Sequence, residues 1–305
     1  MKRLIVLTIL LLVSIIGIYA VMNVNKKPEL ETEKIVVVTT LFPLYDFAKN
    51  IGKDKVELTL LLTPGMEAHS FEPKPSDILK INEADIFIYT GEFMEPWAKD
   101  VISGISNKNV LVVNASDGIK LTKENGNDEI DPHIWLDFSV DKIIIDAMAK
   151  ALVEADGENS VFYKANAEEY NAQLMELDQQ YNNDLAECST KRIIYTGHYA
   201  FGYLADRYGL SYKSLYGISP DSEISVQDLT GMINQVKSEN IEYIFYEKLS
   251  NMQVAETIAD ETGVELLQLN PAHNISKDDF TNAVKFISIM EENLVNLKIG
   301  LKCNR

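Results

Sequence analysis

The sequence predicts an α/β fold with two Rossmann-like lobes, each built on a four-stranded, mainly parallel sheet, and a long rigid helix that joins them. In both halves of the chain, short β-branched or apolar runs alternate with amphipathic stretches, which is typical of parallel sheets covered by helices. Between the halves, residues 161–187 keep apolar side chains on one stripe, enough for ~40 Å of helix. We therefore expect four parts: a signal or anchor with a tether (1–33), an N-terminal lobe (34–138), linking helices (139–189) and a C-terminal lobe (190–305).

The first residues predict export from the cytoplasm. Lys2 and Arg3 precede an uncharged run, Leu4–Met22, which has the pattern of a secretion signal. The run is also nearly long enough to cross a bilayer, so cleavage and retention as a membrane anchor both remain open. Residues 23–33 are polar and are expected to form a tether. The globular part should therefore lie outside the cytoplasmic membrane, at the cell surface or in the periplasm.

The N-terminal lobe is predicted to alternate strands with helices. The strands are expected at residues 35–40, 56–62, 85–89 and 110–114, and the helices at 43–50, 77–83 and 95–103. A proline-rich irregular loop follows the second strand and carries His69. Parallel sheets bind their ligands beyond the carboxyl ends of the strands, and His69 occupies such a position.

The middle of the chain and the C-terminal lobe repeat the pattern. Strands are expected at residues 191–196, 212–216, 243–246 and 265–269, and helices at 140–154, 161–187, 201–208, 226–238, 251–262 and 277–299. The longest helix could be a strut between the lobes or a coiled-coil dimer helix. It holds only about three and a half heptads, so we favour the strut, in a monomeric protein.

Only four histidines occur in the 305 residues: His69, His133, His198 and His273. Three of them, His69, His198 and His273, stand just past apolar runs that are predicted to be strands. Two lobes facing each other would bring these strand ends and His133 to one place. Neutral imidazole is the commonest metal ligand among side chains, and four nitrogens suit a tetrahedral site. The alternative is four unrelated histidines, each with a local hydrogen bond.

His133 lies in the segment Asp-Pro-His-Ile-Trp-Leu-Asp at residues 131–137. Asp131 or Asp137 could accept the second ring proton of His133, which would fix the tautomer of a metal-bound imidazole. Trp135 is predicted to pack in the core. The charged segment before this motif, residues 120–131, is a flap over the site, a metal-collecting loop or, more often for such a run, only a solvated loop.

Composition excludes several classes of function. A net charge of −18 argues against nucleic-acid binding and is compatible with a small cation. The chain lacks HExxH spacing, a Ser-His-Asp arrangement and a glycine-rich phosphate loop, so we do not expect an enzyme. Cys188 and Cys303 lack the spacing of a thiolate metal site, whereas a disulfide between them is open outside the cytoplasm.

Five short segments form a recognisable set. In order they are residues 39–43 (Thr-Thr-Leu-Phe-Pro), 64–73 (Pro-Gly-Met-Glu-Ala-His-Ser-Phe-Glu-Pro), 131–137, 197–201 (Gly-His-Tyr-Ala-Phe) and 217–223 (Gly-Ile-Ser-Pro-Asp-Ser-Glu). With them, the sequence resembles the metal-binding lipoproteins of zinc and manganese ABC importers, extracytoplasmic receptors with two α/β lobes and a long linking helix. The resemblance covers nearly everything from Lys34 onward.

The resemblance implies that His69, His133 and His198 bind the metal. The third ligand is His in zinc-preferring members and Glu in manganese-preferring ones. The fourth is a carboxylate after the last strand, but Asn270 stands near that place, so His273 is our candidate, with Glu67 or water as alternatives. The loop before the Asp-Pro-His motif lacks the histidines of many zinc receptors, and no lipid-attachment cysteine follows the apolar run.

We therefore expect an extracytoplasmic substrate-binding protein that captures Zn²⁺ between its lobes and delivers it to the membrane permease of an ABC importer. Nitrogen-rich ligation favours zinc over manganese, which prefers oxygen donors. The alternatives are the same role for Mn²⁺ or Fe²⁺, a zinc-dependent hydrolase, or a surface adhesin. The long helix should limit hinge opening, so that metal release depends on loop movement around His133 and His273.

Overall fold

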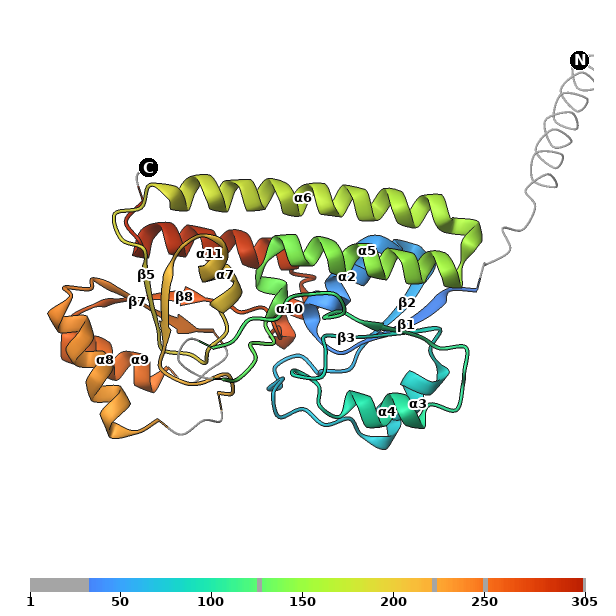
Figure 1. Cartoon of the computed structure of the whole chain (residues 1–305), viewed down its shortest axis with the longest axis horizontal. Coiled ribbons are helices and arrows are strands. Elements are labelled where there is room, and N and C mark those ends of the chain that lie inside the picture. Colours follow the sequence, from blue (N-terminus) through green and yellow to red (C-terminus); the bar gives the residue numbers. More distant parts are fainter. Residues whose placement is uncertain (1–32, 125–127, 221–223, 249–251, 304–305) are drawn as a thin grey trace, which may run out of the picture. The chain divides into compact units, whose positions relative to one another are not determined.

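Two parallel sheets frame the protein in the computed structural model, which describes residues 33–124, 128–220, 224–248 and 252–303 (Figure 1). The first sheet has the strand order β2-β1-β3-β4 and the second has β6-β5-β7-β8, and every strand pair is parallel. The two sheets therefore repeat one plan. The predicted fold class is confirmed, and the sheets are entirely parallel rather than mainly so.

The strands match the apolar runs of the sequence to within a few residues. They are β1 (Ile35–Thr39), β2 (Val56–Leu60), β3 (Ile86–Tyr89), β4 (Leu111–Asn114), β5 (Arg192–Tyr195), β6 (Ser211–Ser214), β7 (Tyr243–Glu247) and β8 (Glu265–Leu269). The central strand β3 is buried along its whole length, as expected for a parallel sheet covered on both faces.

Helices cover both sheets. They are α2 (Phe42–Gly52), α3 (Pro75–Glu83), α4 (Ala98–Gly104), α5 (Phe138–Ala155), α6 (Ser160–Ala186), α7 (Gly202–Arg207), α8 (Val226–Ser238), α9 (Gln253–Thr262), α10 (Lys277–Thr281) and α11 (Phe286–Gly300). Short 3-10 turns occupy Lys53–Lys55, Ile134–Leu136 and Gly157–Asn159. Pro43 lies in the first turn of α2, where its missing amide proton costs no hydrogen bond.

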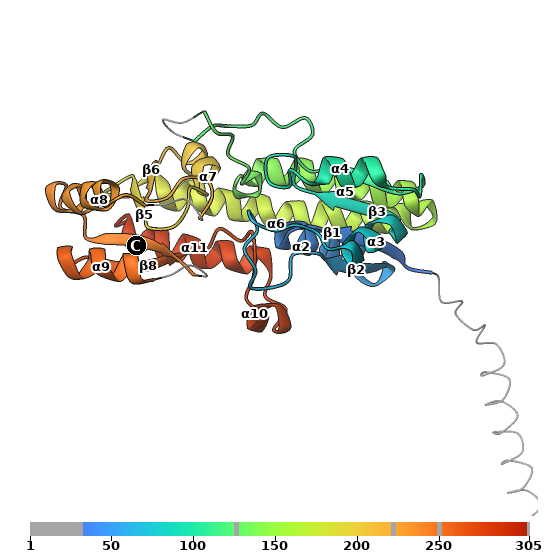
Figure 2. The ribbon, with the colours of Figure 1, turned by 90° about the horizontal axis from the view of Figure 1, so that it is seen from below.

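Helix α6 connects the two halves of the protein. It packs against α2 and α5 beside the first sheet and against α11 beside the second (Figure 1; Figure 2). The Tyr170 hydroxyl donates to Asp46 of α2 at 2.8 Å, and the Tyr181 hydroxyl donates to the carbonyl oxygen of Met290 in α11 at 2.5 Å. These contacts agree with the predicted strut.

The predicted final helix, residues 277–299, is wrong in one respect, because it is divided into α10 and α11. Ala283 adopts a left-handed backbone with φ of 53°, which ends the helical path. A new helix, α11, begins at Phe286, whose amide donates to the buried carboxylate of Asp46 at 3.3 Å. A carboxylate at the amino end of a helix accepts a hydrogen bond from a free amide and interacts favourably with the positive end of the helix dipole.

A disulfide joins Cys188, just after α6, to Cys303, just after α11. The two cysteines are 115 residues apart in the sequence. The pairing that the sequence left open is therefore present in the structure, and it fastens the ends of two helices that already pack together.

Several expectations fall outside the described residues. These are the export signal or anchor with nearly all of its tether, in residues 1–32, and the end of the 217–223 motif, in residues 221–223. In the part of the chain that is described, no helix combines the length and the apolar character needed to cross a membrane. Residues Ile35–Arg305 form one compact unit, and its division at 138/139 and 189/190 remains a prediction.

The buried carboxyl group of Glu95 is expected to make the stability of the protein depend on pH. It accepts hydrogen bonds from the Thr40 hydroxyl at 2.6 Å and from the amides of Gly91 and Thr90 at 3.0 and 3.3 Å. Burial raises the pKa of Glu95 to about 7, although these hydrogen bonds oppose the rise. A carboxyl whose pKa is raised on folding contributes stability below its unfolded pKa and loses it as the pH rises through the folded value.

As the pH rises from about 4.5 to 7, we expect the unfolding free energy of wild type to fall by on the order of 3 kcal/mol more than that of Glu95→Gln, which has no carboxyl group at this position. Urea unfolding of both metal-free proteins at pH 5 and pH 8 measures this difference. An equal difference between the two proteins at both pH values would show that Glu95 does not titrate on this scale.

Candidate metal site

The structure brings all four histidines together. The Nε2 atom of His133 lies 3.3 Å from Nε2 of His69 and 3.2 Å from Nε2 of His198. The ring of His273 is centred 5.3 Å from that of His198 and 6.2 Å from that of His69. Two overlapping groups of three could each hold a cation: His69, His133 and His198 form one, and His198, Glu247 and His273 form the other. That these residues bind metal remains a prediction.

Each histidine lies beyond a strand of one of the sheets. His69 is in the irregular loop after β2, and His133 precedes the 3-10 turn between β4 and α5. His198 comes shortly after the end of β5 at Tyr195, and His273 comes shortly after the end of β8 at Leu269. The Glu67 carboxylate accepts a hydrogen bond from the His69 amide at 3.0 Å, which holds the loop around that histidine. Each sheet therefore contributes two imidazoles.

Of the two aspartates proposed to orient His133, Asp131 takes the role. Its Oδ1 accepts from Nδ1 of His133 at 2.8 Å and from the His133 amide at 3.0 Å. Asp137 instead caps α5 through the Ser139 amide and pairs with Arg207 at 2.9 Å. Because Nδ1 of His133 is engaged with Asp131, Nε2 is the ring nitrogen that His133 presents to the other histidines.

Trp135 packs in the core, as the sequence predicted. Its side chain is 1 % exposed, and its ring is centred 5.4 Å from that of His133. Its indole nitrogen also donates to the carbonyl oxygen of Pro271 at 2.7 Å. Trp135 therefore ties the His133 segment to the loop that carries His273.

Glu247, which sequence reasoning missed, is the partner of His198. Its Oε2 accepts from Nδ1 of His198 at 2.9 Å, and its Oε1 lies 3.9 Å from Nε2 of His273. Glu247 is the last residue of β7, next to β5, whose end carries His198. A carboxylate ending an otherwise apolar strand at this edge of the sheet was the available signal.

The alternatives to His273 as a fourth ligand differ in how they are held. The side-chain oxygen of Asn270 accepts from the Ala272 amide at 2.9 Å, and Asn293 bonds the main chain of Asn270 on both sides. Asn270 therefore shapes the loop. The Nδ1 atom of His273 is buried without a hydrogen-bond partner among the described residues. The ring itself faces the other histidines.

Burial controls the charge of the site. It lowers the pKa of His69 to about 2 and that of His133 well below its usual value, and neighbouring imidazoles lower both further. Burial also lowers the pKa of His273. For His198, burial acts in the same direction, but the carboxylate of Glu247 outweighs it and raises the pKa. His69, His133 and His273 are therefore neutral at physiological pH, the form that binds metal.

A sequence model of the family described as "ZnuA: Zinc-uptake complex component A periplasmic" matches residues 37–300. The chain belongs to this family. The match confirms the resemblance on which the zinc-receptor hypothesis rests. Members of the ZnuA family are components of an uptake complex and are not enzymes, which agrees with the prediction from the sequence.

Relatives of known name and structure agree with the ZnuA assignment. The chain is 34 % identical over 282 residues to the high-affinity zinc uptake system protein ZnuA of Bacillus subtilis (strain 168), covering 88 % of each. It is 31 % identical to the longer zinc-binding protein AdcA of Streptococcus pyogenes serotype M18, with 95 % of this chain matching 61 % of that protein. The crystal structure of the Zn(II)-bound ZnuA-like domain of Streptococcus pneumoniae AdcA superposes with a TM-score of 0.79 and 32 % identity, covering 88 % of this chain and 99 % of that domain.

Two surface cavities differ in their position relative to the four histidines. One, of about 520 Å³, lies between residues 63–66, before His69, and residues 276–278, after His273. Beside it, the Asn274 side chain donates to the carbonyl oxygen of Met66, so the loops carrying these two histidines touch.

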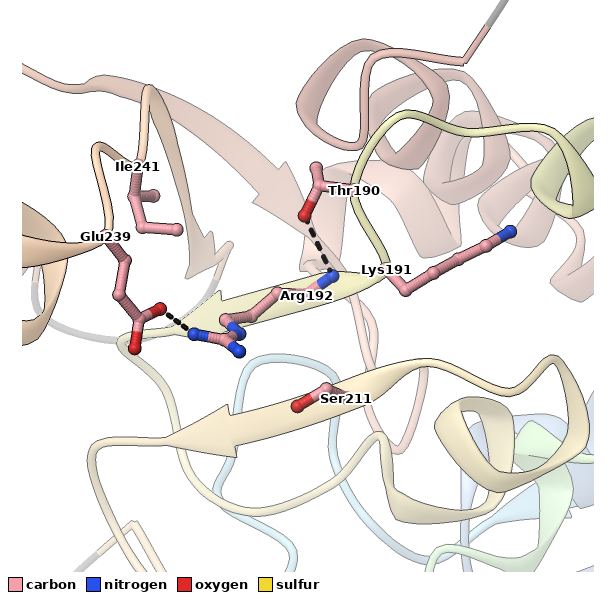
Figure 3. A pocket seen from close by; sticks show the side chains of 6 residues that line it. All are labelled: Thr190, Lys191, Arg192, Ser211, Glu239 and Ile241. Atoms are coloured by element: carbon pink, nitrogen blue, oxygen red, sulfur yellow. Dashed lines mark hydrogen bonds and ion pairs between the residues drawn. The ribbon is translucent and has the colours of Figure 1, made fainter.

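The other cavity, of about 300 Å³, lies at the amino ends of β5 and β6 (Figure 3). Its charged groups are already engaged: Arg192 pairs with Glu239, and Lys191 donates to the carbonyl oxygens of Leu185 and Ala186. Among the residues that line this cavity, the one carboxylate, Glu239, is therefore already paired with a cation of the protein itself.

Proposed function

We propose that the protein is the extracytoplasmic receptor of an ABC importer, that it captures Zn²⁺ between its two lobes, and that His69, His133, His198 and His273 hold the ion. The observation that carries the proposal is that the Nε2 atoms of His69, from the first lobe, and His198, from the second, both lie within 3.3 Å of Nε2 of His133. Its setting in a zinc-uptake family supports the choice of cargo.

The donor set explains capture without catalysis. Four imidazole nitrogens complete a tetrahedral shell, whereas catalytic zinc keeps a position for water. Nitrogen ligands suit zinc, while manganese and magnesium favour oxygen. The carboxylates of Asp131 and Glu247 sit behind two of the imidazoles and fix the nitrogen that each presents. Burial opposes the ionisation of Glu247, but His198 lowers the pKa of Glu247, so this carboxylate also offsets the charge of a divalent ion in a buried site.

A competition titration of the metal-free protein with Zn²⁺ and Mn²⁺ tests the cargo and the ligands. We expect wild type to prefer Zn²⁺, and both His198→Ala and His273→Ala to weaken zinc binding, because each removes a nitrogen donor. Preference for Mn²⁺ would overturn the zinc assignment. Unchanged affinity in His273→Ala would remove that residue from the shell and leave water or Glu67 as the fourth donor.

Two other classes predict different results in the same preparations. A zinc-dependent hydrolase would show turnover that a chelator abolishes, and we expect none. A surface adhesin would keep its adhesive activity after His69→Ala and His133→Ala, whereas a metal receptor would lose its ability to bind zinc. The proposed receptor is exported, is either released by cleavage of its N-terminal segment or anchored by it, and acts as a monomer beside its permease.

Metal release is proposed to depend on the loops around His133 and His273 rather than on hinge motion. Helix α6 packs against elements of both lobes, and Tyr170 and Tyr181 add hydrogen bonds to each side. Small-angle scattering should therefore give nearly the same radius of gyration with and without zinc. A large contraction on zinc addition would contradict this proposal.

A further inference from the structure

Gly202, the first residue of α7, lies directly against the carboxylate that orients His133. A Cβ atom at this position would lie 2.5 Å from Oδ2 of Asp131 and 2.8 Å from the ring and hydroxyl of Tyr199. Atoms cannot approach this closely without displacement. Oδ2 of Asp131 is buried and has no hydrogen-bond partner among the described residues. The missing side chain of Gly202 is what leaves room for that oxygen.

Gly197 has the same relation to the other carboxylate. A Cβ atom there would lie 2.7 Å from Oε2 of Glu247, the oxygen that accepts from Nδ1 of His198, and 2.5 Å from the ring of Tyr195. Both glycines have ordinary backbone angles, unlike Gly65 or Gly91, whose φ values are positive. The requirement for glycine at these two positions is therefore one of space and not of backbone conformation.

The two glycines bound a single short segment, residues 197–202, that also carries His198. Tyr212 of β6 fixes this segment, because its hydroxyl donates to the carbonyl oxygen of His198 at 3.2 Å and accepts from the Ala200 amide at 3.1 Å. The segment cannot easily retreat from an added methyl group. The carboxylates would have to move instead, and with them the imidazoles they hold.

We propose that Gly197 and Gly202 are positioning residues for the metal site: they let one segment press against Glu247 and Asp131 and so hold the imidazoles of His198 and His133 in the geometry that binds zinc. The inference rests on the proposed function. A side chain at either position displaces a carboxylate that is hydrogen-bonded to a ligand. Loss of such a partner typically lowers metal affinity 10–100-fold, and we expect an effect of about that size.

The test uses the full chain and compares Gly202→Ala, Gly197→Ala and the control Gly231→Ala. Gly231 lies exposed in α8, where an added Cβ atom would meet nothing within 4 Å. Zinc affinity is measured by competition with a chromophoric chelator, and ligand geometry by the visible absorption spectrum of the Co²⁺ form. We expect about 10–100-fold weaker zinc binding and an altered Co²⁺ spectrum for the first two variants. The control should match wild type in both.

A double-mutant cycle separates positioning from general damage. Asp131→Ala removes the nearest atom that a Cβ atom at Gly202 would meet, while the contact with Tyr199 remains, so adding Gly202→Ala to that background should cost less affinity than in wild type. Glu247→Ala serves Gly197 in the same way, with the contact to Tyr195 remaining. Equal losses in both backgrounds, wild-type affinity in the single variants, or failure of the double variants to fold would each overturn the inference. Absence of zinc binding by wild type would instead overturn the proposed function.

Discussion

His133→Ala is expected to lose zinc affinity by more than the 10–100-fold that loss of a hydrogen-bond partner behind a ligand typically costs. His133 is central to the cluster, because its Nε2 lies within 3.3 Å of the same atom in both His69 and His198. Removing the His133 side chain takes away one nitrogen donor, and it is the donor that lies next to both His69 and His198. The measurement is a competition titration, with Asp131→Ala as the matched control in which the ligand remains but its partner is gone.

Thermal unfolding provides a second readout of the same variant. A ligand at a thousand times its dissociation constant stabilises a folded protein by about 4 kcal/mol. Zinc should therefore raise the melting temperature of wild type clearly, that of Asp131→Ala less, and that of His133→Ala least. An undiminished zinc-induced rise in His133→Ala would place the ion elsewhere in the protein.

Removal of the disulfide is expected to have the largest effect on stability. Cys188 and Cys303 close a loop of 115 residues that contains the whole second sheet, and long loops lose the most entropy when cross-linked. The double variant Cys188→Ser, Cys303→Ser should lose roughly 2–5 kcal/mol of unfolding free energy. Urea unfolding with and without a reductant measures this loss, and reduced wild type should resemble the variant.

The zinc affinity of the same variant serves as the internal control. The bridge joins the ends of α6 and α11, and neither cysteine is among the residues that contact the histidines. Affinity should therefore stay near that of wild type while stability falls. An unfolding midpoint that does not change on reduction would show that the bridge contributes little, because the packing of α6 on α11 already holds the two ends together.

Strand ends and helical stripes made most of the architecture predictable. β8 and α8 begin and end where the periodicity of the sequence indicates, because apolar patterning and turn residues act over a few positions. The meeting of the histidines followed from topology, since the carboxyl ends of parallel strands lie at one edge of a sheet. The same rule applied to carboxylates would have identified Glu247.

Other features depend on contacts between distant parts of the chain. The break between α10 and α11 is stabilised by Asp46, which lies 240 residues before Phe286. The disulfide depends on α6 and α11 ending side by side, and the role of Gly202 depends on Asp131 approaching it from another element. These contacts join residues that are far apart in the sequence, so no local sequence pattern predicts them and they become visible only in the folded structure.

Because each sheet supplies two of the four imidazoles, a zinc ion held by all of them acts as a removable staple between the halves of the molecule. Zinc binding and the position of the loops around His133 and His273 are then thermodynamically coupled: a contact that favours displaced loops lowers the zinc affinity by the same factor by which zinc weakens that contact. A membrane partner that shifts these loops would thereby release the cargo without contacting any of the four histidines.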